Sequence, residues 1–191
     1  GEDIRAIDTR TAQQQLHELA YEAGKLGISA EEDILAFVKA GNQLVVALGE
    51  DLGGAEAVRE LMKVNAILGE TQNLGMERAL LATGSAINEI SQTSRASAGP
   101  IADVVSRIGA IGAAAKLQMP DLIALAGTAD AMGQSAEVAG TAFNKFITTL
   151  QTNTVDVAYA LGLDPDSLRT MLDSGQGIQA IIQIFEKMNQ M

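Results

Sequence analysis

The side chains that could support catalysis or bind a metal ion are few and scattered along the sequence. His17 is the only histidine, it lies near Glu18 and Glu22, and the chain has no cysteine. Most protein metal sites need several converging ligands, and without further histidine or any cysteine only carboxylates remain to supply them. A serine–histidine–aspartate triad would depend on His17, yet the sequence contains no nucleophile-elbow motif. We therefore expect His17 to be a surface residue of a polar, solvent-facing helix over residues 2–25.

Three acidic residues have the chemistry that glycoside cleavage requires. These are Asp121, Asp130 and Glu137. The reaction uses two carboxyl groups that face each other across a cleft. Here each acid falls at the start or on the exposed side of a predicted helix, where the helix dipole and solvation account for it. Cleavage of peptidoglycan, a muralytic activity, remains an alternative that would need such a cleft.

Two further segments come close to known ligand-binding motifs but lack essential parts. Residues 109–112 (GAIG) fall within a helical pattern, without the strand or the Gly-Lys-Ser/Thr ending of a phosphate-binding loop. Residues 164–173 contain Pro165 and lack the terminal glutamate of an EF-hand. We predict no catalytic residue, no metal site and no cofactor, and hence that the chain is not an enzyme.

Composition favours a folded helical protein. The chain has 191 residues, of which 47% are hydrophobic and 3% aromatic. The hydrophobic content excludes a disordered chain. A core of Leu, Ile, Val, Met and Ala with few aromatic residues suits packed helices better than a β-sandwich. The net charge of −11 argues against nucleic acid or an anionic membrane as an electrostatic partner.

Hydrophobic spacing predicts helices throughout and no strand. Between residues 101 and 115, apolar side chains recur at steps of three and four, which places them on one helix face. A second such stripe runs through Val138, Ala142, Phe146 and Leu150, flanked by Ala139, Phe143 and Ile147. Over the whole chain we predict about ten short-to-medium helices in an irregular all-α bundle without a sheet.

Small residues on two of these helices predict close helix–helix contacts. Glycine and alanine leave a nearly bare surface against which another backbone can pack. The expected helix-contact face consists of Ile101, Val105, Ile108, Gly109, Gly112, Ala139, Phe143 and Phe146. In a soluble chain such a face favours tight packing between helices.

Capping and proline residues predict where several helices begin. Ser29-Ala30-Glu31-Glu32 has the pattern of a capping box. Pro100 and Pro120 suit the first helical position because proline has no N–H to leave unpaired there. Ser135 and Asp164, the latter followed by Pro165, are predicted N-caps. We divide the chain into residues 1–98 and 99–191, with a hinge at 92–99.

No apolar stretch is long enough to cross a bilayer. The longest candidate, residues 108–115, lies between Arg107 and Lys116. The sequence opens at Gly1 within a charged, helix-like segment, so we expect it to be a fragment of a longer protein. Membrane contact is not predicted, although insertion of residues 101–125 into a bilayer, as a membrane-perturbing module, remains an alternative.

Several segments together resemble the core region of phage tail tape measure proteins. The strongest similarity covers residues 122–143, above all Ala139-Gly140-Thr141-Ala142-Phe143, and Gln118 departs from the glycine often found before the next helix. No single motif is diagnostic, and the order and spacing of the segments carry the resemblance. The other matching segments are residues 26–29, 86–89, 94–98, 101–107 and 161–163.

This resemblance implies a structural protein of a tailed-phage or prophage virion. Tape measure proteins occupy the tail tube, set its length and leave with the DNA. The implied partners are the tail tube protein, tail assembly chaperones and the tail-tip or baseplate hub, together with self-association, and no specific nucleic acid. The implied location is the virion tail, and the host cytoplasm during assembly. The broken helices favour a folded module of that protein over its long ruler rod.

Overall fold

The computed structural model describes residues 2–5, 7 and 11–191, and every regular element in this part of the chain is helical. Twelve α-helices and one short 3-10 helix there confirm the predicted all-α fold. The elements are α1 (Glu2–Arg5), α2 (Gln13–Lys25), α3 (Glu31–Leu48), η1 (Glu50–Leu52), α4 (Gly54–Ile67), α5 (Glu70–Leu74), α6 (Met76–Thr93), α7 (Ala98–Ala114), α8 (Met119–Ala131), α9 (Ala136–Thr152), α10 (Thr154–Leu161), α11 (Pro165–Asp173) and α12 (Gly177–Asn189).

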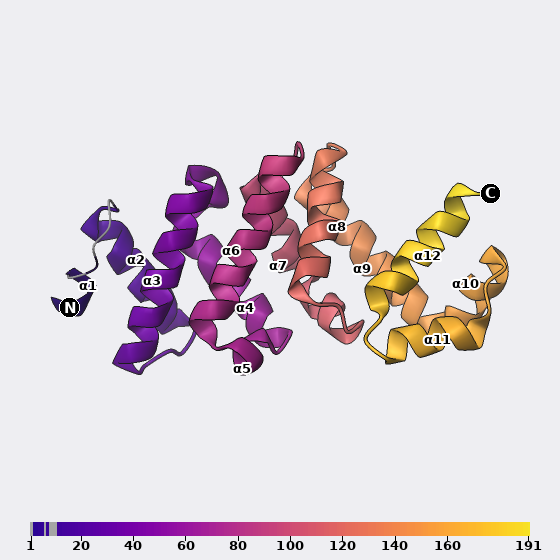
Figure 1. Ribbon diagram of the computed structural model, residues 1–191, viewed down its shortest axis with the longest axis horizontal. Coiled ribbons are helices and arrows are strands. Elements are labelled where there is room, and N and C mark those ends of the chain that lie inside the picture. Colours follow the sequence, from indigo (N-terminus) through magenta and orange to yellow (C-terminus); the bar gives the residue numbers. More distant parts are fainter. Residues whose placement is uncertain (1, 6, 8–10) are drawn as a thin grey trace.

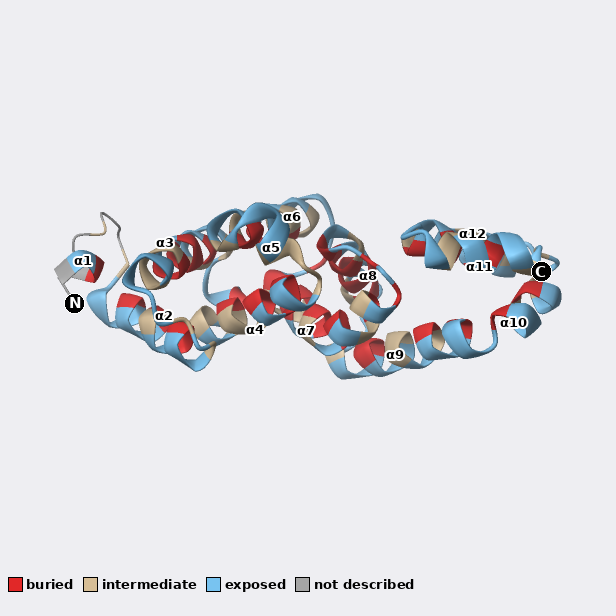
Figure 2. Cartoon of the chain, turned by 90° about the horizontal axis from the view of Figure 1, so that it is seen from below, coloured by how far each residue is buried: buried red, intermediate tan, exposed pale blue. Residues whose placement is uncertain are grey.

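The helices form an elongated array in two layers (Figures 1 and 2). One layer contains α2, α4, α7 and α9, and the other contains α3, α6 and α8, with the buried residues mainly between them. Helix packing agrees with this arrangement, because α4 contacts α2 and α7, while α6 contacts α3 and α8. The two ends of the chain lie at opposite ends of the array. We call α2 to α8 the body and α9 to α12 the arm.

Helix α7 is the centre of the body. It packs against α4, α6, α8, α9 and η1. Its residues Ile101, Val105 and Ile108 are completely buried, as the apolar spacing predicted, and the wider core is made of aliphatic side chains and alanine. Phe37 on α3 is the fully buried aromatic residue among the largest core side chains. Burial of this aliphatic surface is the main favourable term for the fold.

Several predicted helix starts are correct and others are shifted. The Ser135 side chain accepts a hydrogen bond from Val138 N at 3.3 Å, and Asp164 accepts one from Ser167 N at 2.8 Å, which confirms both N-caps. The capping box at Ser29 is wrong, because the extended N-cap residue is Ala30. Ser29 lies one residue before this N-cap position, so its side chain does not cap the first turn.

Two other helices begin before the residue that was predicted. Helix α7 begins at Ala98, two residues before Pro100, and α8 begins at Met119, directly before Pro120. Both prolines therefore lie within the first turn, where no intrahelical N–H bond is lost. The single helix expected over residues 2–25 is also wrong, since Ala12 is extended and α2 starts after it.

The predicted hinge at residues 92–99 is a short connection with contacts of its own. Helix α6 continues to Thr93, and Ser97 N donates a 2.7 Å hydrogen bond to Asp130 of α8. A Cβ atom placed on Gly99 would lie 2.0 Å from the carbonyl oxygen of Asp51, so only glycine fits there. The pairs α4–α7 and α6–α8 also pack across this connection. The division into residues 1–98 and 99–191 stays a prediction.

Candidate functional site

The predicted helix-contact face lies in the interior of the molecule. On α7, Ile101, Val105 and Ile108 have no exposed surface, and Gly109 and Gly112 are also buried. On α9, Ala139 is buried, and Phe143 and Phe146 are half-buried. These residues meet other helices of the same chain. A role for them in contacts with other proteins stays a prediction.

The two glycines of α7 explain how neighbouring helices approach it so closely. A Cβ atom on Gly109 would lie 2.7 Å from Cγ2 of Val64 on α4. A Cβ atom on Gly112 would lie 2.6 Å from Cδ2 of Leu122 on α8. Both distances are shorter than carbon atoms tolerate, so α4 and α8 pack directly on the bare faces that these glycines provide.

Helix α9 continues this packing on the opposite side of α7. Gly140 faces Arg107, whose Cβ would lie 3.0 Å from an added methyl group, and the Asn144 amide donates to the carbonyl oxygens of Gly140 and Arg107. The buried stripe of α9 runs through Ala139, Gly140, Ile147 and Leu150. The predicted stripe is thus correct at Leu150 and at its flanking residues Ala139 and Ile147, but wrong at its start, since Val138 is 54% exposed and Ala142 is exposed.

The candidate catalytic residues are not brought together. His17 and Glu18 are exposed on α2. Asp121 accepts a 2.9 Å hydrogen bond from Gln118 N at the start of α8, while Asp130 near the end of that helix accepts one from Ser97 N. Glu137 lies exposed in the first turn of α9. Asp121 and Asp130 thus bond to backbone N–H groups at two different helix ends, and no shared cleft joins the three acids.

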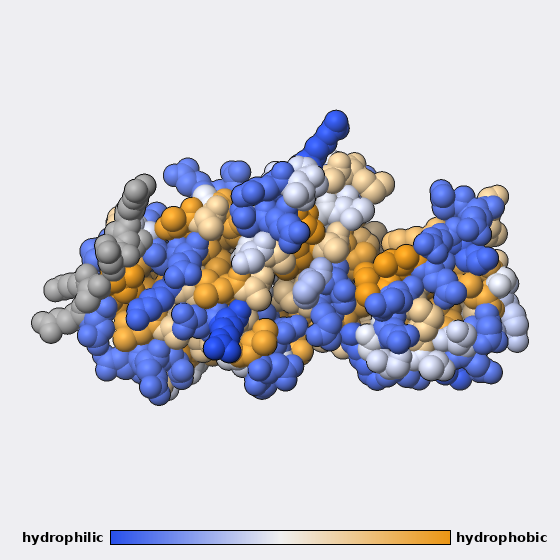
Figure 3. All heavy atoms as spheres, viewed as in Figure 1, coloured by the Kyte–Doolittle hydropathy of each residue, from blue (hydrophilic) through white to orange (hydrophobic). Residues whose placement is uncertain are grey.

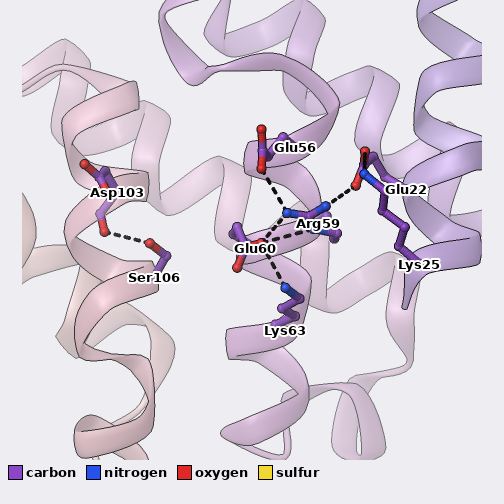
Figure 4. A network of polar contacts seen from close by, with 8 residues as sticks. All are labelled: Glu22, Lys25, Glu56, Arg59, Glu60, Lys63, Asp103 and Ser106. Carbon is purple, nitrogen blue, oxygen red and sulfur yellow. Dashed lines mark hydrogen bonds and ion pairs between the residues drawn. The ribbon is translucent and has the colours of Figure 1, made fainter. Parts of the chain in front are cut away.

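A charge network that the sequence did not reveal joins α2 to α4 (Figure 4). Arg59 lies at its centre, with Nη1 2.6 Å from Glu22 Oε2 and Nη2 2.6 Å from Glu60 Oε1 and 3.0 Å from Glu56 Oε1. Lys25 pairs with the other oxygen of Glu22, Oε1, while Lys63 pairs with the same Glu60 oxygen, Oε1, that Arg59 contacts. The spacing of the α4 members indicates neighbouring positions on one helix, but Glu22 lies 37 residues away from Arg59.

This network lowers the pKa of its carboxyl groups. A hydrogen bond from Lys25 lowers the pKa of Glu22, burial opposes it, and the charges of Arg59 and Lys25 lower it further. Burial raises the pKa of Glu60, but hydrogen bonds from Lys63 and Arg59 outweigh it, so this pKa also lies below its usual value. Both groups are held as carboxylates, and the Glu22–Arg59 ion pair joins α2 to α4.

A surface cavity of about 300 Å³ lies beside the network, between α4 and α7. Glu56, Glu60 and Asp103 line it, which brings carboxylates from two helices to one depression. Each of them is ion-paired, Asp103 with Arg107 at 2.8 Å and the other two with Arg59. Glycoside cleavage needs a carboxylic acid with a raised pKa, and the lowered pKa of Glu60 is the reverse. In the part of the chain that the structure describes, no group of His, Cys, Asp and Glu side chains could hold a metal ion.

Comparison with protein-family models gives the wider context for this helical array. Residues 2–191 match the family described as phage-related minor tail protein. The chain belongs to this family. Neither the search of curated proteins nor the search of solved structures found a match. Because the family match covers nearly the whole chain, the tail-protein assignment applies to the body and the arm alike, and it implies a component of the virion tail.

The structure of this minor tail protein family member also bears on membrane contact. Among residues 2–5, 7 and 11–191, no helix is both long and apolar enough to cross a bilayer. The segment considered for insertion, residues 101–125, forms α7 and the first half of α8, and most of its apolar side chains are buried in the body.

Proposed function

We propose that this chain is the core region of a tail tape measure protein, acting in tail assembly, tail length determination and genome delivery. The observation that carries the proposal is the match to the phage-related minor tail protein family over residues 2–191. The resemblance of residues 86–143 to tape measure proteins supports the finer assignment within that family. We also propose that its role is structural rather than enzymatic.

The fold favours a folded module of such a protein over an extended rod. A single helix of 191 residues would be roughly 290 Å long at about 1.5 Å per residue. Instead, α4 folds back on α2, and α7 on α4, to bury a shared core. A module of this kind presents a defined surface to partners, whereas a rod measures length by its extent.

The proposed partners are the tail tube protein, tail assembly chaperones and the tail-tip or baseplate hub, with self-association as a further contact. The chain would meet the chaperones in the host cytoplasm and the other partners in the virion tail. The exposed apolar side chains of the arm, among them Tyr159, Ile182 and Met188, support contacts with other proteins. The acidic net charge offers no general attraction to nucleic acid.

The test is an in-frame deletion of residues 100–150 in the phage that encodes this chain, followed by tail measurement in electron micrographs. The deletion removes α7, α8 and most of α9, and hence the centre of the core. We expect absent or aberrant tails, because the remaining helices lose the surface on which they fold. Gly24→Ala is the matched control, since this helical glycine has no atom within 4 Å of an added methyl group.

The other outcomes separate the parts of the proposal. Tails shortened in proportion to the 51 deleted residues, roughly 77 Å at helical rise, would support length determination but contradict the folded-module role. Normal tails on particles that cannot infect would support genome delivery. Tails of normal length on fully infectious particles would contradict the proposed function as a whole.

A further inference from the structure

A small apolar cavity opens on the body between α5, α6 and α8. Its volume is about 120 Å³. Its lining consists of Ala79, Ala82 and Ala86 on α6, Leu74 on α5, and Met119 and Ile123 on α8. The small alanines and the bulkier side chains around them leave a volume comparable to one apolar side chain.

The polar residues at the base of this cavity are already paired with each other. The Asn65 amide donates to the carbonyl oxygen of Leu61 and to the Thr83 hydroxyl, both at 3.0 Å. The Thr83 hydroxyl can donate in return to Asn65 Oδ1 at 3.2 Å. The pair is almost completely buried and needs no further partner. The cavity therefore offers little to a water molecule, which requires two or more polar partners.

Size and polarity restrict what the cavity can hold. An aliphatic cavity of about 150 Å³ is known to bind a single benzene molecule and to stay dry otherwise. At about 120 Å³, this cavity matches one leucine or methionine side chain and is too small for a lipid acyl chain. Its α5 wall is a five-residue helix between Gly69 and Gly75, whose φ angles of 79° and 81° favour glycine. The wall is thus a short segment joined to the body by two flexible residues.

The mouth of the cavity carries a negative charge. Glu70 is the ionisable residue among the lining residues, and it is half-buried. Within the described residues, its carboxylate forms no ion pair. Together with the net charge of −11, this favours an occupant that carries a cation and disfavours an anionic lipid surface.

From these observations we propose that the cavity between α5, α6 and α8 binds one leucine or methionine side chain of a partner protein. The partner segment carries a lysine or arginine about one helical turn from that side chain, so that the cation reaches Glu70. The site lies outside the arm and does not depend on the tape measure assignment.

Two probes test this site on the full chain. One is benzene, and the other is a synthetic alanine-based helical peptide with one central leucine and a lysine four residues to either side. Binding is followed by the methyl NMR signals of labelled alanine, isoleucine and methionine. We expect both probes to give saturable shifts of the Ala79, Ala82, Ala86 and Ile123 methyl signals. A peptide with the leucine replaced by alanine should bind at least about tenfold more weakly, as expected when a buried anchor is lost.

Matched variants separate specific binding from general effects. Ala82→Leu fills the cavity and should abolish the shifts caused by both probes, and Ala86→Leu is the second filling variant should the first unfold. Ala142→Leu makes the same change at an exposed helical alanine of the arm and should leave binding unchanged. Glu70→Gln should weaken peptide binding about threefold and leave benzene binding unchanged, because a partly exposed ion pair contributes little.

Three results would overturn the proposal. The first is the absence of saturable shifts at these methyl groups with benzene, which would mean that the cavity does not open to a ligand. The second is binding that persists in both filled variants. The third is binding of benzene without binding of the leucine peptide, which would limit the site to small molecules.

Discussion

The body and the arm differ in how they pack and expose their apolar residues. In the body, glycines let helices approach until an added methyl group would collide with the neighbour, as at Gly84 with Leu44 and Gly127 with Ile90. In the arm, large apolar side chains are exposed at a higher density. The arm exposes Val138, Val155, Tyr159, Ile182, Phe185 and Met188, while the longer body exposes Tyr21, Val46, Ile67 and Leu74. Figure 3 shows hydrophobic residues at the surface where the arm meets the body.

This difference shows that the apolar residues of one chain are packed in two ways. With few aromatic residues, the body fills its interior by bringing backbones together, which leaves few gaps. The arm packs in this way where Gly140 meets Arg107, but α12 buries Ala180, Ile181 and Ile184 on one face and exposes Ile182 and Met188 on another. The Phe146 and Phe185 rings, with centroids 5.3 Å apart, link α9 to α12. We infer that stability resides mainly in the body, and that the exposed apolar side chains of the arm are available for partner contact.

The largest expected effect is a cavity at the centre of the body. Ile108→Ala should lower the free energy of unfolding by about 4 kcal/mol, because Ile108 has no exposed surface. The same change at Ile182, which is 49% exposed on α12, should cost less than about 1 kcal/mol. Urea denaturation of both variants measures the difference. Equal losses would contradict the separation of body and arm.

Gly99 gives the next largest effect. Gly99→Ala should destabilise by about 3 kcal/mol, because the added methyl group meets the Asp51 carbonyl oxygen, which belongs to the backbone and cannot rotate away. Gly24→Ala on α2 is the matched control and should raise stability by about 0.5–1 kcal/mol, since open space surrounds that position in a helix. Thermal melts followed by circular dichroism report both values. A stable Gly99→Ala variant would show that η1 and α7 do not pack as described.

A smaller effect should appear as a pH dependence of stability that arises from the Glu22 ion pairs in the body. The pKa of Glu22 in the folded chain lies below its ordinary value of 4.5, so its ion pairs stabilise the protein above that pH. That contribution is lost as the pH falls through the lowered pKa. Glu22→Gln should therefore be less stable at pH 7 and lose less stability on acidification, as measured by urea denaturation from pH 7 to pH 3.

The control for this pH effect lies one turn away. Glu18 is exposed on the same helix and accepts a 3.2 Å hydrogen bond from the neutral Gln14 amide, so Glu18→Gln should leave the pH profile close to that of the unchanged chain. Identical profiles for Glu22→Gln and the unchanged chain would mean that the Arg59 network does not hold α2 on α4.

The features that were predicted correctly from the sequence depend on the spacing of nearby side chains. The α7 stripe, the N-caps at Ser135 and Asp164, and the aliphatic core all follow from side chains within a few residues of each other. The sequence did not predict which helices meet. The contact of Gly109 with Val64 and the bond from Ser97 to Asp130 join residues far apart in the chain, which periodicity alone cannot pair.

The arm shows a second limit of prediction from sequence. Helix α12 carries apolar residues on more than one face, so spacing alone did not distinguish the buried Ile181 from the exposed Ile182. On α9, Val138 fits a helical stripe, but the packing of Gly140 on Arg107 turns the helix so that Val138 faces solvent. The sequence also did not predict the apolar cavity beside α5, because α5 and α8, which both line it, lie far apart in the chain.

Hydrogen exchange followed by mass spectrometry tests most directly whether stability resides in the body. Backbone amides of α7, which is packed on several sides, should exchange only through global unfolding. Amides of α12 should exchange through local opening, at a rate at least about tenfold faster. Equal protection of α7 and α12, with both lost together in Ile108→Ala, would show one cooperative unit and contradict the separation of body and arm.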